Sequence, residues 1–206
     1  MSLEDKKGRS HTPKGKDSKG KILDMAEKVF AQKGFAAASI SDVVGKLGIS
    51  AGALYHHFPS KKDLLGGIAK RSMRRMGELM DDWLDDESIS PGEKMDLFLK
   101  AVDERRQLKK KLFRIDLGTV SEDGDVHEMV IQAGLEPIGE RLTRMIGLGN
   151  ATGEFQVEYP RATAIFMFLM LADFMHRSKR LEEVAPVEQL DRAMHDAMNQ
   201  LLRRKS

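Results

Sequence analysis

Apolar residues recur every three or four positions through most of the chain, which is the spacing of one face of an α-helix. The first such stripe runs from Ile22 to Phe30, and Gly34 follows it as a residue that commonly closes a helix. No segment shows the strict alternation of apolar and polar residues that marks a half-buried strand. The pattern therefore predicts an all-α fold with about nine helices.

Two short helices joined by a glycine-containing turn are predicted after the first stripe. Ser39 is a candidate N-cap for a helix that Gly48 ends, and Ser50 is a candidate N-cap for a helix at 51–57. Such a pair of helices, joined by a turn of three or four residues, is a helix-turn-helix. The spacing therefore predicts a DNA-reading motif.

A long helix is predicted after Pro59, where Ser60 and Asp63 resemble a capping box with Asp in the usual Glu position. Its apolar positions continue to Trp83, and we interpret this helix as a connector between domains. Gly147, Gly149 and Gly153 indicate a loop later in the chain. Further helices are predicted at 91–110, 111–120, 125–146, 159–181 and 186–204.

The composition is that of a soluble globular protein, with 41% hydrophobic and 32% charged residues among 206. The absence of cysteine excludes disulfides and thiolate chemistry, and a reducing cytoplasm fits it best. The longest apolar run, at 162–172, is far shorter than the roughly 20 residues that cross a bilayer. No phosphate-binding glycine loop, compact metal cluster or nucleophile motif is present, so we expect neither an enzyme nor a cofactor.

Positive charge is concentrated near the N-terminus. Residues 1–66 hold 12 Lys or Arg against 7 Asp or Glu, a net +5, whereas residues 67–206 hold 22 against 25, a net −3. This asymmetry favours a polyanion as the partner of the N-terminal part. We therefore expect a basic arm at 1–17, a DNA-binding domain at 18–66 and a regulatory domain at 67–206; the arm is either a solvated tail or a contact with DNA.

The run FAQKGFAAASISDVVGKLGISAGALYHHFPSKKDLL resembles the N-terminal domain of the TetR family of transcriptional regulators. The resemblance covers the Ser cap, the second helix, the Gly-Ile-Ser turn, the Tyr-x-x-Phe recognition helix and the Ser-Lys cap. It implies that Tyr55, His57 and Lys61 contact phosphates, with His56 beside them. The alternative for Tyr55 is that its ring packs partly under the domain and leaves only the hydroxyl free.

The recognition helix is suited to the major groove because its first residues are small. None of these first residues can make a bidentate base contact, so we expect readout to be shared with flanking polar residues and DNA shape. The predicted DNA-binding residues are Ser39, Ser41, Lys46, Ser50, Ala51, Gly52, Ala53, Tyr55, His56, His57 and Lys61.

The same resemblance implies that the C-terminal helices bind a small inducer and form a homodimer through the last two long helices. The run IFMFLMLADFM at 165–175 is apolar on nearly every side, as expected for a helix covered on two faces. Asp173 within it is expected to pair with His176, with a basic group across the dimer, or with a ligand. His127 and His176 do not have metal-ligand spacing. The candidate ligand residues are Phe98, Val102, Phe113, Leu117, Phe166, Met170 and Phe174.

Thirteen methionines are many for this length, and they suit either an adaptable lipophilic pocket or an ordinary core. The favoured function is that of a homodimeric repressor, released from a palindromic DNA operator by a small lipophilic inducer. The alternative is a helix-turn-helix dimer that is controlled by a protein partner or acts without an inducer.

Overall fold

The computed structural model describes residues 14–112 and 124–203, and within these ranges every element is a helix, as predicted. Most of the helix predicted at 111–120 lies outside the described residues. No helix in the described ranges has the length and apolar character needed to span a membrane. The helices are α1 (Lys14–Lys33), α2 (Ile40–Leu47), α3 (Ala51–His57), α4 (Lys61–Asp85), α5 (Pro91–Leu112), α7 (Gly124–Thr152), α8 (Pro160–Glu182) and α9 (Val187–Leu202).

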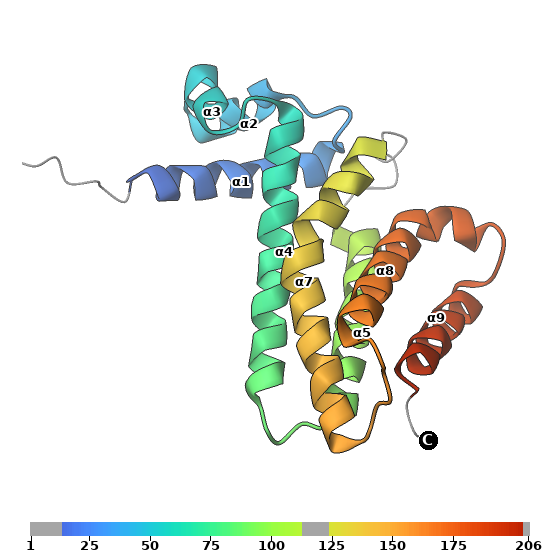
Figure 1. Ribbon diagram of the computed structural model, residues 1–206. Helices are drawn as coiled ribbons and strands as arrows, with labels where there is room; N and C mark the ends of the chain where they lie inside the picture. The colour runs from blue at the N-terminus through green and yellow to red at the C-terminus, as the bar shows by residue number, and fades with distance from the viewer. Residues whose placement is uncertain (1–13, 113–123, 204–206) are drawn as a thin grey trace, which may run out of the picture.

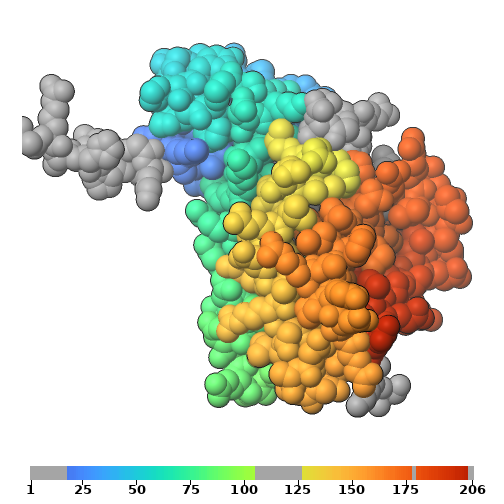
Figure 2. Space-filling model, viewed as in Figure 1, coloured from blue at the N-terminus to red at the C-terminus, as the bar shows by residue number. Residues whose placement is uncertain are grey.

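The helices surround two hydrophobic cores that meet along α4. The smaller core joins α1, α2 and α3 to the first turns of α4, where Leu64, Leu65 and Ile68 are buried. The larger core begins further along α4, at Met80 and Leu84, and includes α5, α7, α8 and α9. In Figure 1, α4 runs from the small helical group at the top down the length of the larger bundle. The two groups are also apparent in the space-filling view (Figure 2). The predicted boundary between residues 66 and 67 therefore falls inside a continuous helix.

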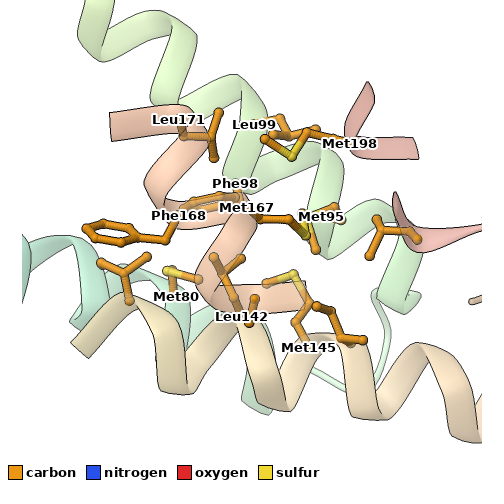
Figure 3. Close-up of a cluster of buried hydrophobic side chains, with 14 of the residues drawn as sticks. Met80, Met95, Phe98, Leu99, Leu142, Met145, Met167, Phe168, Leu171 and Met198 are labelled. Atoms are coloured by element: carbon orange, nitrogen blue, oxygen red, sulfur yellow. The ribbon is translucent and has the colours of Figure 1, made fainter. Parts of the chain in front are cut away.

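Methionine supplies much of the larger core. Met80, Met95, Met145, Met167 and Met198 are each fully buried, and Figure 3 shows them gathered around Phe98 and Leu142. Their unbranched side chains fill the irregular spaces between helices that cross at different angles. These five methionines therefore correspond to the ordinary-core interpretation.

The start of α1 and the end of α7 differ from the prediction. The first helix begins at Lys14, inside the predicted arm, because a helix already nucleated extends through residues that have no apolar face. The loop predicted at Gly147 and Gly149 is wrong, because α7 continues to Thr152 and only Gly153, at φ 78°, lies beyond its end. A Cβ on Gly149 would lie 2.0 Å from the Phe155 ring, so this glycine permits close packing within a helix.

Candidate nucleic-acid interface and ligand cavity

Side-chain caps fix the start of both short helices. The Ser39 hydroxyl accepts a hydrogen bond from the Asp42 backbone N–H at 3.1 Å, and the Asp42 carboxylate accepts one from the Ser39 N–H at 2.8 Å. This capping box satisfies two backbone groups at the start of α2. Gly48 ends α2 in the left-handed region at φ 66°, and the Ser50 hydroxyl then caps α3 through the Ala53 N–H at 3.1 Å. The predicted helix-turn-helix is therefore present with the expected caps.

Helix α3 has one buried face and one exposed face. Leu54 and Phe58 are buried in the smaller core, and they hold the helix by one side. The other side is open to solvent and carries small or hydrogen-bonding side chains, with Tyr55 47% exposed. The exposed members of this face are Ala51, Gly52, Ala53, Tyr55 and His56, with His57 half-buried beside them. An exposed helix of this kind, held only along its back, can enter a groove of DNA without unfolding any core.

The two predicted lysine contacts already have partners within the domain. Lys61 Nζ donates to the Ala36 carbonyl oxygen at 3.2 Å and lies 4.4 Å from the centre of the Phe35 ring. Partial burial lowers the pKa of Lys61 from its ordinary value. Lys46 Nζ donates to Gln32 Oε1 at 2.7 Å. Each ammonium group has three donors, so these bonds place both lysines without using all their hydrogen-bonding capacity.

Of the three predicted serines, two cap helices and one is exposed at the start of α2. Ser39 and Ser50 are exposed, but their hydroxyls serve as the caps of α2 and α3. Ser41 is exposed at the start of α2. All eleven residues predicted for DNA contact therefore come from three elements, α2, α3 and the start of α4, or from the caps that precede them.

An arginine joins α4 to α1, and the sequence analysis did not identify it. The Arg71 side chain is only 10% exposed, and its guanidinium donates to Asp24 and to Glu27 at 2.5 Å each. It also donates to the Gly20 carbonyl oxygen at 3.4 Å. The three acceptors lie on successive turns of α1, so one side chain fixes this helix against the connector. The sequence holds no local signal for such a pairing, because the partners are 44 and 47 residues apart.

A cavity of about 510 Å³ lies between α1, α4, α5, α7 and α8. This volume lies within the ~300–1,000 Å³ that small-molecule sites occupy. Its walls are mostly apolar, and Met73, Met76, Met129 and Met175 are among them. Other apolar wall residues include Leu65, Ile68, Phe98, Ile138, Phe168 and Leu171. Since Leu65 and Ile68 also belong to the smaller core, the cavity touches both parts of the molecule.

The predicted ligand residues are only partly at this cavity. Phe98 and Val102 line it, whereas Phe166, Met170 and Phe174 do not. The wall residues of α8 recur at 168, 171, 172, 175 and 176, which is one helical face, and residues 166, 170 and 174 lie on another. Phe166 is 65% exposed on that other face. Phe113 and Leu117 lie outside the described residues.

Most of the cavity wall comes from α4 and α7, which the sequence analysis did not select. The signal in α4 was present, because its wall residues at 65, 68, 69, 72, 73, 76 and 79 form one stripe at three- and four-residue spacing, with Arg75 at its edge. The sequence indicates that such a stripe faces the interior of the protein. It does not show whether the stripe packs in a core or lines a cavity.

Two histidines at the cavity lie against each other. The rings of His127 and His176 stack with centroids 4.2 Å apart and planes at 29°. His127 Nε2 is 3.6 Å from the nearer Asp173 carboxylate oxygen. Asp173 accepts two hydrogen bonds at 2.9 Å from Arg177 Nε, one helical turn later on α8. This contact raises the pKa of Arg177. Asp173 therefore pairs with Arg177 of its own helix and also lies near His127 of α7. Among the described residues no group of three or more potential ligands is arranged to hold a metal ion.

Comparison with known proteins gives a family match for the helix-turn-helix part and structural matches for nearly the whole chain. The family model for bacterial regulatory proteins of the tetR family matches residues 22–68. The HTH-type transcriptional regulator CymR of Pseudomonas putida is 36% identical over 81 residues, which are 35% of this chain and 40% of CymR. The chain spans less than half the length of the curated relatives it matches. These relatives are transcriptional regulators, in agreement with the expectation that the chain is not an enzyme.

Solved structures match over nearly the whole chain. RolR in complex with the ligand resorcinol has a TM-score of 0.69 at 19% identity, covering 93% of this chain and 90% of RolR. FadR of Bacillus subtilis in complex with stearoyl-CoA has a TM-score of 0.60 at 17% identity, covering 89% of this chain and 97% of FadR. At these identities the likeness concerns the fold. Residues 22–68 therefore match the DNA-binding domain of tetR-family bacterial regulatory proteins, and the arrangement of helices over nearly the whole chain is similar to that of RolR and FadR.

Proposed function

We propose that this chain is a DNA-binding transcriptional repressor that works as a homodimer and leaves a palindromic operator when a small lipophilic ligand binds. The observation that carries this proposal is the joining of an exposed helix-turn-helix to an apolar cavity through one helix, α4. We also propose residues 18–66 as the DNA-binding domain and 67–206 as the regulatory domain, with 1–17 as a basic arm.

In the proposed complex, α3 lies in the major groove. Ala51, Gly52 and Ala53 bring the backbone close to the bases, and the alanine methyls suit contacts with thymine methyls. Tyr55, His57 and Lys61 contact phosphates and fix the register of the helix, with His56 beside them. Ser39, Ser41 and Lys46 share in the readout, and Ser50 caps the helix. Sequence preference then depends strongly on DNA shape and on the spacing of the two readers, about 34 Å in a dimer.

The proposed dimer interface is the outer face of α8 and α9. Phe166 on α8 is 65% exposed and Leu201 on α9 is 40% exposed, although both are large apolar side chains. Exposed apolar side chains of this size are expected to be covered in an oligomer. Replacing Phe166 with Glu is expected to convert the dimer to monomer, as measured by light scattering after gel filtration.

The ligand is proposed to act by shifting a population. RolR with resorcinol and FadR with stearoyl-CoA are structures of the same fold that hold a small molecule. A ligand in the present cavity would contact Leu65 and Ile68, which also pack in the smaller core. The ligand changes DNA binding only if its affinity differs between a conformation that binds the operator and a conformation that does not.

Selection of bound fragments from random-sequence DNA supplies an operator with which to test the reader. We expect Tyr55→Phe and Lys46→Gln each to weaken binding of this operator, since the first loses a donor to phosphate and the second loses a positive charge beside the DNA. Lys46→Gln should also reduce the salt dependence by about one unit of slope. Arg161→Gln is the matched control, because this exposed arginine lies at the start of α8, and no predicted DNA contact lies on that helix. Unchanged binding in both reader variants would contradict the assignment. Release of the operator by a protein partner, with no small molecule effective, would favour control by that partner.

A further inference from the structure

The cavity is polar at one end. Its polar wall residues are Glu27, Ser72, Arg75, Glu104, His127 and His176. Glu27 comes from α1, and Ser72 and Arg75 come from the middle of α4. His127 lies in the first turns of α7, two residues before Met129, whose sulfur would be 2.8 Å from a Cβ on Gly66. The polar end of the cavity is therefore the end that faces the smaller core.

The opposite end of the cavity is apolar. Phe98, Ile138 and Phe168 line it, and Figure 3 shows Phe98 and Phe168 next to the buried side chains of the larger core. All three are buried, with at most 2% exposure for Phe98 and Ile138. A ligand that fills this cavity must be amphipathic, because a polar group at the apolar end loses its water without gaining a hydrogen bond.

The stacked histidines are suited to bind an uncharged hydroxyl group. A neutral imidazole offers one donor and one acceptor, and a hydroxyl group also offers both. The two rings lie 4.2 Å apart, so their nitrogen atoms reach the same region of the cavity wall.

Acidic and basic groups around the pair balance one another. Glu27 and Glu104 line the same end of the cavity, and so does Arg75. Asp173 lies 3.6 Å from His127 but pairs with Arg177 at 2.9 Å, and Glu27 pairs with Arg71 at 2.5 Å. An uncharged hydroxyl needs no counter-charge at this end, whereas a charged group would lose its water among charges that are largely balanced already.

We propose that the cavity binds a ligand with an apolar body and one uncharged hydroxyl or phenol group, and that His127 and His176 bind this group. The apolar body lies against Phe98, Ile138 and Phe168. The inference rests on the ligand-binding part of the proposed function, and it adds the chemical class of the ligand, its direction in the cavity and the residues that select it.

Matched probes separate the contributions of shape and of the polar group. The full chain is titrated with butylbenzene, 4-butylphenol, 4-butylbenzoate and 4-butylbenzylamine, which share one body and differ at one end. Binding is followed by NMR of methionine methyl groups, since Met73, Met76, Met129 and Met175 line the cavity. Met198, fully buried in the core and not at the cavity, is the internal reference.

We expect 4-butylphenol to bind about tenfold more tightly than butylbenzene, the effect of one net hydrogen bond. In His127→Phe and His176→Phe the stacked rings are retained and the nitrogens are lost, so this preference should fall below about threefold in at least one of them. His195→Gln is the matched control, because this histidine pairs with Asp103 at 2.9 Å and lies outside the cavity wall. It should retain the full preference.

Three results would overturn the inference. They are equal binding of butylbenzene and 4-butylphenol, tighter binding of the carboxylate or the amine than of the phenol, and an undiminished preference in both phenylalanine variants. If butylbenzene shifts the four cavity methyls in any of these cases, the ligand-binding part of the proposed function survives. If no probe shifts these methyls up to its solubility, the inference and that part fail together, while DNA binding is tested separately.

Discussion

The contact between Arg71 and α1 provides a quantitative test of how the connector is held. Replacing Arg71 with Met removes the guanidinium and keeps most of the aliphatic stem. Glu27 is 26% exposed in its side chain and Arg71 is 10% exposed, so their hydrogen bond is partly protected from water. A bond to a charged group contributes about 1.5–3 kcal/mol, and we expect about 1.5 kcal/mol here because of the remaining exposure. Asp24 is 58% exposed, so its ion pair should contribute only about 0.5 kcal/mol or less.

Double-mutant cycles separate these two contributions. Arg71→Met is combined with Glu27→Gln in one cycle and with Asp24→Asn in another, and the free energy of unfolding is measured in urea at one fixed protein concentration. The coupling energy should be about 1–1.5 kcal/mol for Glu27 and below about 0.5 kcal/mol for Asp24. With a slope of about 2 kcal/mol per M, Arg71→Met alone should lower the urea midpoint by about 0.75–1 M. A larger coupling for Asp24 than for Glu27, or none for either, would refute this reasoning.

Two further predictions concern α7 and α2. Gly147→Ala should stabilise the protein by about 0.5–1 kcal/mol, since no atom lies within 4 Å of the new Cβ; Gly149→Ala should destabilise it by about 1–3 kcal/mol, because its Cβ meets the buried Phe155 ring. Thermal unfolding of both variants checks this pair, and effects of the same sign would contradict it. The Lys33 hydrogen bond, followed by those from Ser39, lowers the pKa of Asp42 to about 2. Its stabilising effect is therefore complete above the ordinary value of 3.8 and is lost as the pH falls toward 2. Carboxyl NMR should place the pKa higher in Lys33→Met, and an unchanged value would remove Lys33 as the main cause.

The reader could be predicted from sequence because its signals are local. Ser39, Gly48 and Ser50 each act on backbone groups within a few residues, so their effect does not depend on the rest of the fold. The all-α fold of the rest of the chain could also be predicted from local signals, because the apolar spacing of a helix is a short-range pattern.

The cavity and the connector contacts depend on neighbours that are distant in sequence. Phe166 and Phe168 are both apolar residues of α8, yet only Phe168 faces the cavity, because two positions correspond to about 200° around a helix. Gly149 was interpreted as a loop residue, although its role is set by Phe155, whose ring occupies the space of a side chain. In each case the deciding information lies in which elements pack together.

The continuity of α4 limits how regulators of this kind can be recombined. A chimera joined at residue 66 would separate the reader from Ile68, which completes its core, and from Arg71, which holds α1. A chimera joined after Arg71 would carry both residues with the reader. It would also transplant Leu65, Ile68 and Ala69, which form part of the cavity wall. An exchange that preserves the core of the helix-turn-helix domain therefore alters the cavity wall, so the two parts cannot be recombined independently by a simple swap at residue 66.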